Sequence, residues 1–223
     1  YDFFEQIVKQ GKDLLYLDMC SALSSSVNNA AAAINRISEK YPERRVYFLD
    51  SFAVTGILGC LVRDLVSMKE AGHSMEEVIA YGEANKFNYI GRFMVDDLEW
   101  LRRGGRLSNA SALLGTLLAI KPMIYVSKEG KLVAYGKAHG KRKTWSALIN
   151  GMKNEMNEET EKHEVMVIHS GTEEDAGIFR NMIVKEYPQL AEKITINTLG
   201  PVITAHVGPG FMAVVYYGKE REL

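Results

Sequence analysis

The sequence has little cysteine, almost no net charge and no long apolar run. Its two cysteines, Cys20 and Cys60, lie in apolar stretches without the spacing of metal ligands. So few cysteines favour reduced thiols in a cytoplasmic protein. The formal net charge of −1 argues against a dedicated nucleic-acid-binding protein. The longest strongly apolar run, around residues 112–120, falls well short of the roughly 20 residues that span a bilayer.

Signatures of several enzyme classes are missing as well. The sequence has neither the G-x-S-x-G nucleophile motif nor a phosphate-binding P-loop. His73, His163 and His169 have no partner at metal-ligand spacing. We therefore expect neither a resident cofactor nor a metal site.

Strands and helices alternate in the first part of the chain. The expected strands cover 13–19 and 45–51, and the expected helices cover 2–10, 27–40, 54–72 and 74–84, the last opened by the capping box "SMEE". Strands separated by helices of this length imply right-handed βαβ crossovers and a parallel sheet.

The pattern changes after residue 85. The expected strands cover 88–96, 164–170, 193–198 and 211–217, with a hairpin over 123–138 that turns at Glu129-Gly130, and the expected helices cover 98–104, 108–120, 144–156 and 172–187. We therefore predict an α/β protein of two lobes. Residues 1–85 form an N-terminal parallel α/β (Rossmann-like) lobe, and residues 86–223 form a C-terminal mixed α+β lobe. Two lobes without a flexible linker usually enclose a ligand cleft.

A cluster of serines follows the first expected strand. In "CSALSSS" (20–26), serines stand between the end of a strand and the start of a helix. This is where parallel sheets bind ligands, and the first N–H groups of a helix suit an anion. One serine would suffice as a helix cap, with the others exposed. An anion site and a plain cap therefore both remain open.

One histidine and two basic clusters also stand out. His206 lies between Gly-Pro corners in "GPVITAHVGPG" (200–210), which predicts a rigid loop that aims the ring at a ligand. A satisfied core histidine is the alternative. The basic clusters are "LRRGGRLS" (101–108) and "HGKRKTW" (139–145). Both suit solvated surface, although the double glycine before Arg106 allows its guanidinium to turn inward.

Four stretches together resemble the motifs of the DegV family, in the family's order. They are "LLYLDMCSALSSSVNNA" (14–30), "FLDSFAVTGILGCLV" (48–62), the long segment from "VDDLEWLRRGGRLS" to "HGKRK" (95–143), and "GPVITAHVGPGFMAVVYYG" (200–218). The resemblance implies a bacterial protein that binds one long-chain fatty acid, palmitate-like or oleate-like. It further implies a carrier subunit that presents the acyl carboxylate to a separate ATP-dependent fatty acid kinase, with transient membrane contact allowed. It also implies that an N-terminal segment of the family lies upstream of residue 1.

The resemblance assigns roles residue by residue. Ser24 matches the serine of the family's L-S-G-T turn, with Ser25 and Ser26 where the family usually has Gly and Thr. His206 matches the histidine of the G-P-x-I-x-x-H-x-G-P-G motif, and Arg106 falls in G-G-R-[IL]-S. Where the family tends to read R-G-R-K-K, this chain has residues 139–143. The expected carboxylate ligands are therefore Ser24, Ser25, Ser26, His206, Arg106 and Arg142.

The apolar helices 54–66 and 110–120 are the expected walls of an acyl tunnel. The wall candidates are Phe52, Ile57, Leu61, Leu113, Leu114, Leu117 and Ile120, for each of which plain hydrophobic core is the alternative. Three other functions remain open. Ser24 with His206 as base would form an acyl- or phosphoryl-transfer enzyme. His206 could instead bind a small ketone, as in dihydroxyacetone kinases, or the protein could be regulatory and bind no ligand.

Overall fold

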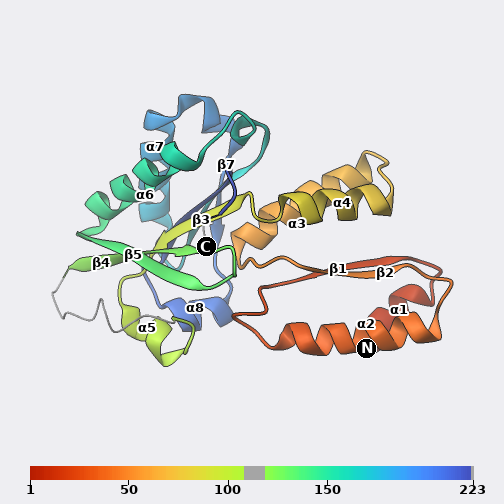
Figure 1. The fold of residues 1–223 in the computed structure, drawn as a ribbon. Coiled ribbons are helices and arrows are strands. Elements are labelled where there is room, and N and C mark those ends of the chain that lie inside the picture. Colours follow the sequence, from red (N-terminus) through yellow and green to blue (C-terminus); the bar gives the residue numbers. More distant parts are fainter. Residues whose placement is uncertain (108–118, 222–223) are drawn as a thin grey trace.

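The computed structural model describes residues 1–107 and 119–221, which form two sheets and their covering helices (Figure 1). The strands are β1 (Leu14–Asp18), β2 (Val46–Asp50), β3 (Tyr89–Met94), β4 (Ile120–Val126), β5 (Leu132–His139), β6 (Val165–His169), β7 (Ile194–Thr198) and β8 (Met212–Tyr217). The helices are α1 (Asp2–Val8), α2 (Ser26–Lys40), α3 (Gly56–Glu70), α4 (Met75–Asn85), α5 (Leu98–Arg103), α6 (Lys141–Glu155), α7 (Glu173–Glu186) and α8 (Pro201–Val207), with 3-10 turns η2 (Thr160–Lys162) and η3 (Pro188–Lys193).

Residues 1–50 form a small lobe around a two-stranded parallel sheet. β1 pairs with β2 from Leu14 opposite Val46 to Asp18 opposite Asp50. α2 packs on this sheet through an alanine-rich stripe that recurs at helical spacing and contains Val27, Ala30, Ala33, Ile34 and Ile37. The expected parallel α/β arrangement of the first part of the chain is confirmed.

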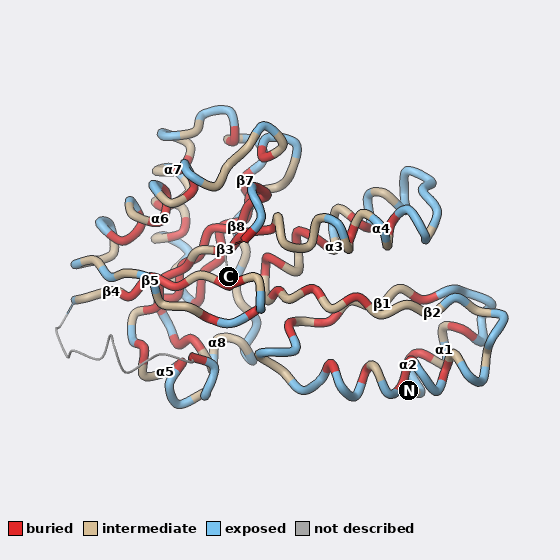
Figure 2. The backbone as a smooth tube through the Cα atoms, in the orientation of Figure 1, coloured by how far each residue is buried: buried red, intermediate tan, exposed pale blue. Residues whose placement is uncertain are grey.

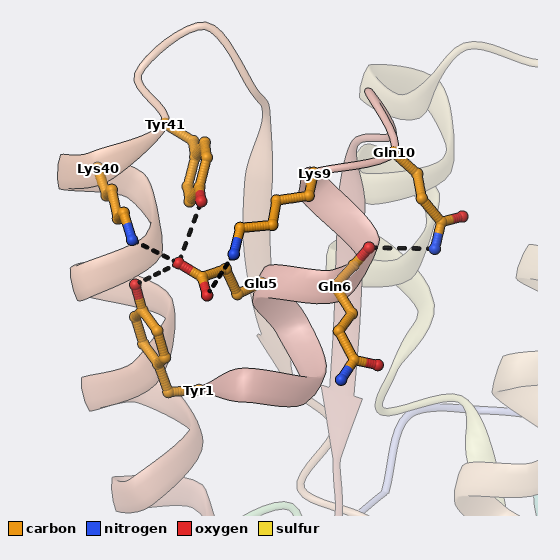
Figure 3. A network of polar contacts seen from close by, with 7 residues as sticks. All are labelled: Tyr1, Glu5, Gln6, Lys9, Gln10, Lys40 and Tyr41. Carbon is orange, nitrogen blue, oxygen red and sulfur yellow. Dashed lines mark hydrogen bonds and ion pairs between the residues drawn. The ribbon is translucent and has the colours of Figure 1, made fainter.

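A polar network fastens α1 to α2 (Figure 3). The Glu5 carboxylate accepts hydrogen bonds from Lys40 at 2.6 Å, from the Tyr1 hydroxyl at 2.9 Å, from Lys9 at 3.0 Å and from the Tyr41 hydroxyl at 3.1 Å. The Lys40 bond is the first cause of a pKa of about 2 for Glu5. Because the network is exposed to solvent, its contribution to stability is modest.

The second sheet is six-stranded, in the order β5-β4-β3-β8-β6-β7. Its β6–β7 pair is parallel, whereas β3 is antiparallel to both β4 and β8. Alternate residues of β8 face opposite cores: Val214 packs with α6 and α7, whereas Val215 packs with α3. With helices on both faces, β6 and β8 are buried along their whole length (Figure 2). The expected mixed α+β arrangement is confirmed.

Helix α3 connects the two sheets. A Cβ on Gly56 would lie 2.3 Å from Ile168 Cδ1, and one on Gly91 would lie 2.5 Å from Ile57 Cδ1. These two glycines let the start of α3 approach the six-stranded sheet closely. α3 thus belongs by sequence to the part of the chain before residue 85, but it packs on the six-stranded sheet, whose strands all come after residue 85. The lobe boundary near residue 85 stays a prediction.

Two expectations about local structure are wrong. Residues 200–210 contain helix α8 rather than an extended rigid loop, because Pro201 occupies its first turn and Gly208, with φ of 77°, ends it. Residues 120–122 begin β4 rather than end a helix, since Ala119 has φ of 76° and the chain turns into the strand there. The rest of the expected helix, 108–118, lies outside the described residues. No helix in the described ranges has the length and apolar character needed to cross a membrane.

Candidate functional site

A cavity of about 290 Å³ lies where the small lobe meets the six-stranded sheet. Its lining comes from the β1–α2 turn, the β2–α3 connection, β3, the end of α5, the β4–β5 hairpin, α8 and β8. The lining residues are Met19, Leu23, Ser24, Val54, Thr55, Ile57, Gly91, Phe93, Leu101, Arg106, Val126, Leu132, Val202, Ile203, His206, Val207, Phe211, Ala213 and Val215. The polar side chains among them belong to Ser24, Thr55, Arg106 and His206. An apolar cavity with a few polar groups is the usual form of a small-molecule site.

The Ser24 hydroxyl is part of a hydrogen-bonded chain. Ser24 Oγ lies 2.9 Å from Ser26 Oγ, and the Ser26 hydroxyl donates to Asp18 Oδ2 at 3.2 Å. Because Ser26 gives its single proton to Asp18, the Ser24 hydroxyl donates to Ser26 in this arrangement. A rotation about the Cα–Cβ bond of Ser24 would redirect that proton towards a ligand.

His206 lies in the last turn of α8 and packs against the end of α5. A Cβ on Gly104 would lie 2.6 Å from His206 Nδ1, so only glycine permits this approach. Trp100 of α5 packs closely against Gly208 at the end of α8, since its ring would lie 2.4 Å from a Cβ on Gly208. Among the described residues, the His206 ring has no hydrogen-bond partner. The ring lines the cavity without being bound to another described residue.

Arg106 joins α5 to the serine turn. Its Nε donates to the Leu23 carbonyl at 3.3 Å, and its Nη1 donates to the Gly104 carbonyl. Gly105, with φ of 68°, gives the sharp turn that places the guanidinium beside the cavity. Arg106 is an exposed residue, so the inward turn of its guanidinium stays a prediction.

Thr55 belongs to the lining and was not predicted. Its φ of 52° and ψ of −130° lie outside the conformations that a β-branched residue favours. Such strain persists only where the surroundings fix it, and it is concentrated at functional sites. The Thr-Gly pair at the start of an expected helix was the available signal, but backbone strain itself is not visible in a sequence.

The structure brings together some of the predicted residues and separates others. The same cavity is lined by Ser24, Arg106, His206 and Ile57. Arg142 instead lies in a separate hollow at the start of α6 with Lys141 and Trp145. It is separated because α6 packs on the face of the six-stranded sheet that is opposite to α3.

The other predicted residues that the structure describes do not line the cavity. Ser26 is turned to Asp18, and Ser25 is the N-cap of α2. Phe52 packs against Phe87 with tilted rings at a centroid distance of 5.6 Å, and Leu61 is fully buried in the core beneath α3. Ile120 pairs with His139 at the far end of β4, while Leu113, Leu114 and Leu117 lie outside the described residues. Within the described ranges, no group of three or more His, Cys, Asp or Glu residues could hold a metal ion.

Comparison with known proteins matches this chain to one protein family. A family model described as "Uncharacterised protein, DegV family" matches residues 1–219. A DegV domain-containing protein of Clostridium perfringens is 37% identical over 222 residues, which cover 98% of this chain and 74% of that protein.

Solved structures agree with this assignment. The fatty acid binding DegV family protein of Streptococcus agalactiae is 28% identical, with a TM-score of 0.82, and the match covers 98% of this chain and 75% of that one. The Fatty Acid Kinase (Fak) B3 protein of Streptococcus pneumoniae, solved with linoleic acid, has a TM-score of 0.86 at 22% identity and covers 98% of this chain and 76% of that one. At that identity the likeness is one of fold alone. The match along residues 1–219 and the identity to the Clostridium protein together show that this chain belongs to the DegV family.

Proposed function

We propose that this chain binds one long-chain fatty acid in the cavity and presents its carboxylate to a separate ATP-dependent kinase. The observation that carries the proposal is the composition of the cavity. Its wall is apolar except for a hydroxyl pair, a guanidinium and an imidazole, contributed by Ser24, Thr55, Arg106 and His206. An amphipathic ligand with one anionic end matches this lining.

The acyl chain would supply most of the gross binding energy. About fifteen methylenes, at ~0.8 kcal/mol each, amount to about 12 kcal/mol of burial. Ordering the flexible chain and losing its translational freedom offset much of this gain. Phe93, Phe211 and Val215 from the sheet, and Ile57 from α3, are the apolar surfaces that such a chain would contact.

The polar groups would fix the orientation of the ligand. A buried carboxylate is costly unless hydrogen bonds satisfy it. In the proposed complex His206 donates one N–H, the rotated Ser24 hydroxyl donates a second bond, and Arg106 supplies the positive charge. Within residues 1–107 and 119–221 the imidazole has no hydrogen-bond partner, which supports this role for His206.

Family resemblance supports the proposal of a kinase partner. The solved Streptococcus pneumoniae neighbour is named as a fatty acid kinase B protein, and family resemblance implies the same division of labour here. We place the chain in a reducing compartment, consistent with Cys20 and Cys60, which are free and buried.

Lipid content is the direct test of the proposal. Denaturing mass spectrometry of the purified protein should detect one fatty acid per chain, or stripped protein should take up oleate or palmitate with one-to-one stoichiometry. His206→Ala should weaken uptake about tenfold to a hundredfold, the effect of losing a hydrogen bond to a charged group. His73→Ala is the control, since His73 is exposed on the α3–α4 turn. A stripped protein that takes up neither acid would refute the proposal.

An acyl-transfer enzyme is the second candidate, and the geometry gives it less support. A nucleophilic serine needs a hydrogen bond to its base, whereas the Ser24 hydroxyl is paired with Ser26. Turnover of a chromogenic long-chain ester that disappears in Ser24→Ala would favour the enzyme over the carrier.

A further inference from the structure

Arg221 is a buried cation near the cavity that is not part of its lining. The residue is 5% exposed and follows β8. Its Nη1 donates to the carbonyl oxygens of Phe52 at 2.7 Å and Ser127 at 3.2 Å. Its Nη2 donates to those of Lys86 at 3.2 Å and Ser51 at 3.4 Å. One guanidinium thus binds four backbone carbonyls from distant parts of the chain.

This acceptor set contains no carboxylate. Among the described residues Arg221 forms no ion pair, and burial lowers the pKa of its guanidinium to about 10. A buried charge without a counter-charge is costly. Lysine could not replace it, because the planar guanidinium carries five donors in a fixed fork whereas an ammonium is a compact point charge. The position therefore requires the shape of arginine as well as its charge.

Three of the four carbonyls belong to segments that lead into the cavity wall. Ser51 and Phe52 open the β2–α3 connection, which continues into Val54 and Thr55 of the lining. Ser127 opens the β4–β5 turn, whose flanking residues Val126 and Leu132 also line the cavity. Arg221 thereby fixes two separate parts of the wall relative to each other.

A third part of the wall is joined to these two through Gly130. A Cβ at Gly130 would lie 1.9 Å from Cys20 Sγ and 3.4 Å from the Phe52 carbonyl oxygen. Cys20 Sγ also contacts the Gly130 carbonyl oxygen at 3.3 Å. Cys20 begins the turn that carries Leu23 and Ser24 into the lining. The β2–α3 connection, the β4–β5 turn and the β1–α2 turn, here called the three connections, therefore converge beside the Arg221 guanidinium.

The β2–α3 connection needs such support because its backbone is strained. Phe52 has φ of 47° and Thr55 has φ of 52°, both in the left-handed region. Non-glycine residues stay there only when surrounding contacts hold them. The shortest of the four Arg221 bonds is to the Phe52 carbonyl oxygen, next to this strained segment.

We propose that Arg221 is a positioning residue of the ligand site, which clamps the three connections so that the cavity wall keeps its shape. The inference rests on the proposed fatty acid function for the identity of the ligand. Arg221 does not touch the cavity; it acts through Val54 and Thr55 on one side and Val126 and Leu132 on the other. Weakening the clamp should raise the rate of ligand release markedly, whereas the melting temperature should fall only slightly.

The test compares Arg221→Lys with Arg180→Lys. Arg180 also donates to a partly buried backbone carbonyl, that of Ala191, at 2.9 Å. It lies on α7, away from the cavity. Release of a dansyl-labelled fatty acid from the loaded protein would be followed by stopped-flow fluorescence, with melting temperatures recorded alongside. We expect R221K to release the probe about tenfold faster than wild type, as expected for one charged hydrogen bond lost, and R180K to stay within about twofold. Equal rates in wild type and R221K, or equal acceleration in both variants, would overturn the inference.

Hydrogen exchange provides a readout that needs no ligand. It can also be applied to wild-type protein if the variant does not fold. In R221K, amides of residues 51–57 and 127–131 should exchange faster while β6 is unchanged. If R221K does not fold, wild-type protein suffices: the amides of these two segments and of residues 219–221 should exchange with a common opening rate. Independent opening would count against the clamp. Wild-type protein that shows common opening but binds no fatty acid would refute the proposed function and leave the clamp intact.

Discussion

Every residue of β6 and β8 is buried in the six-stranded sheet, whereas β1 has buried residues only at Leu14 and Asp18 (Figure 2). In the described chain β1 and β2 pair only with each other, so each has an unpaired edge. The small lobe compensates with the exposed Glu5 network (Figure 3), which water and salt weaken. We therefore expect the six-stranded sheet to contribute more to the stability of the fold than the small lobe does.

Matched truncations in the two cores should show the largest difference. Phe179 is 0% exposed and packs on Trp145 at 5.9 Å between ring centroids, while Phe4 is 7% exposed and packs on Tyr16 at 4.9 Å. Phe179→Ala should lower the free energy of unfolding by about 3–5 kcal/mol. Phe4→Ala should cost about 2 kcal/mol, because the thin lobe can relax around the gap. Urea unfolding of both variants measures this, and equal losses would abolish the distinction between the lobes.

The junction of the two regions can be loosened at Gly130. Gly130→Ala introduces a Cβ only 1.9 Å from Cys20 Sγ, at φ of 76°. Gly72→Ala is the control for the backbone alone, since Gly72 has φ of 90° and nothing within 4 Å of the added Cβ. We expect G130A to lose about 1–3 kcal/mol more than G72A, the usual cost of overpacking. G130A should also bind oleate more weakly, and identical behaviour of the two variants would mean that the junction does not need this contact.

Acid should affect the small lobe through Glu5 by a smaller amount. The Lys40 hydrogen bond is the first cause that lowers the Glu5 pKa in the folded state from 4.5 to about 2. A depressed folded pKa means that the contribution to stability is complete above pH 4.5 and is lost as pH falls towards 2. Amide exchange in α1 should therefore accelerate across this range, and Glu5→Gln should remove the Glu5-dependent part of the change. An unchanged profile in E5Q would show that the network does not hold α1.

Much of the fold could be predicted because its patterns are local. The alanine stripe of α2, the Ser74–Glu77 capping box and the apolar runs of β6 and β8 each determine an element from neighbouring residues. α8 was missed because seven residues are too few for a helical period to stand out between Gly-Pro corners. The expected helix over 108–120 was wrong at Ile120, where β4 begins. This strand can contain Pro122 because β3 ends opposite Met123, so the missing N–H of Pro122 breaks no bond to β3.

The site was less accessible to sequence reasoning because its residues meet only through long-range packing. Ser24, Arg106 and His206 carried local signals, and all three line the cavity. Arg142 carried a similar signal in a basic cluster, but the packing of α6 places it in another hollow. The wall residues Phe93, Val126 and Val215 look like ordinary strand residues in the sequence. Nothing local distinguishes them from core.

The position of β8 in the six-stranded sheet has a consequence for biosynthesis. β8 lies between β3 and β6. It pairs with β3, which is made more than a hundred residues earlier, and with β6, which is made more than forty residues earlier. Until residues 212–217 have left the ribosome, the β3–β4–β5 unit and the β6–β7 pair cannot be joined, and the cavity lacks one wall. The growing chain must therefore hold apolar strands without their partners until β8 has been made, and exposed apolar strands are prone to aggregate.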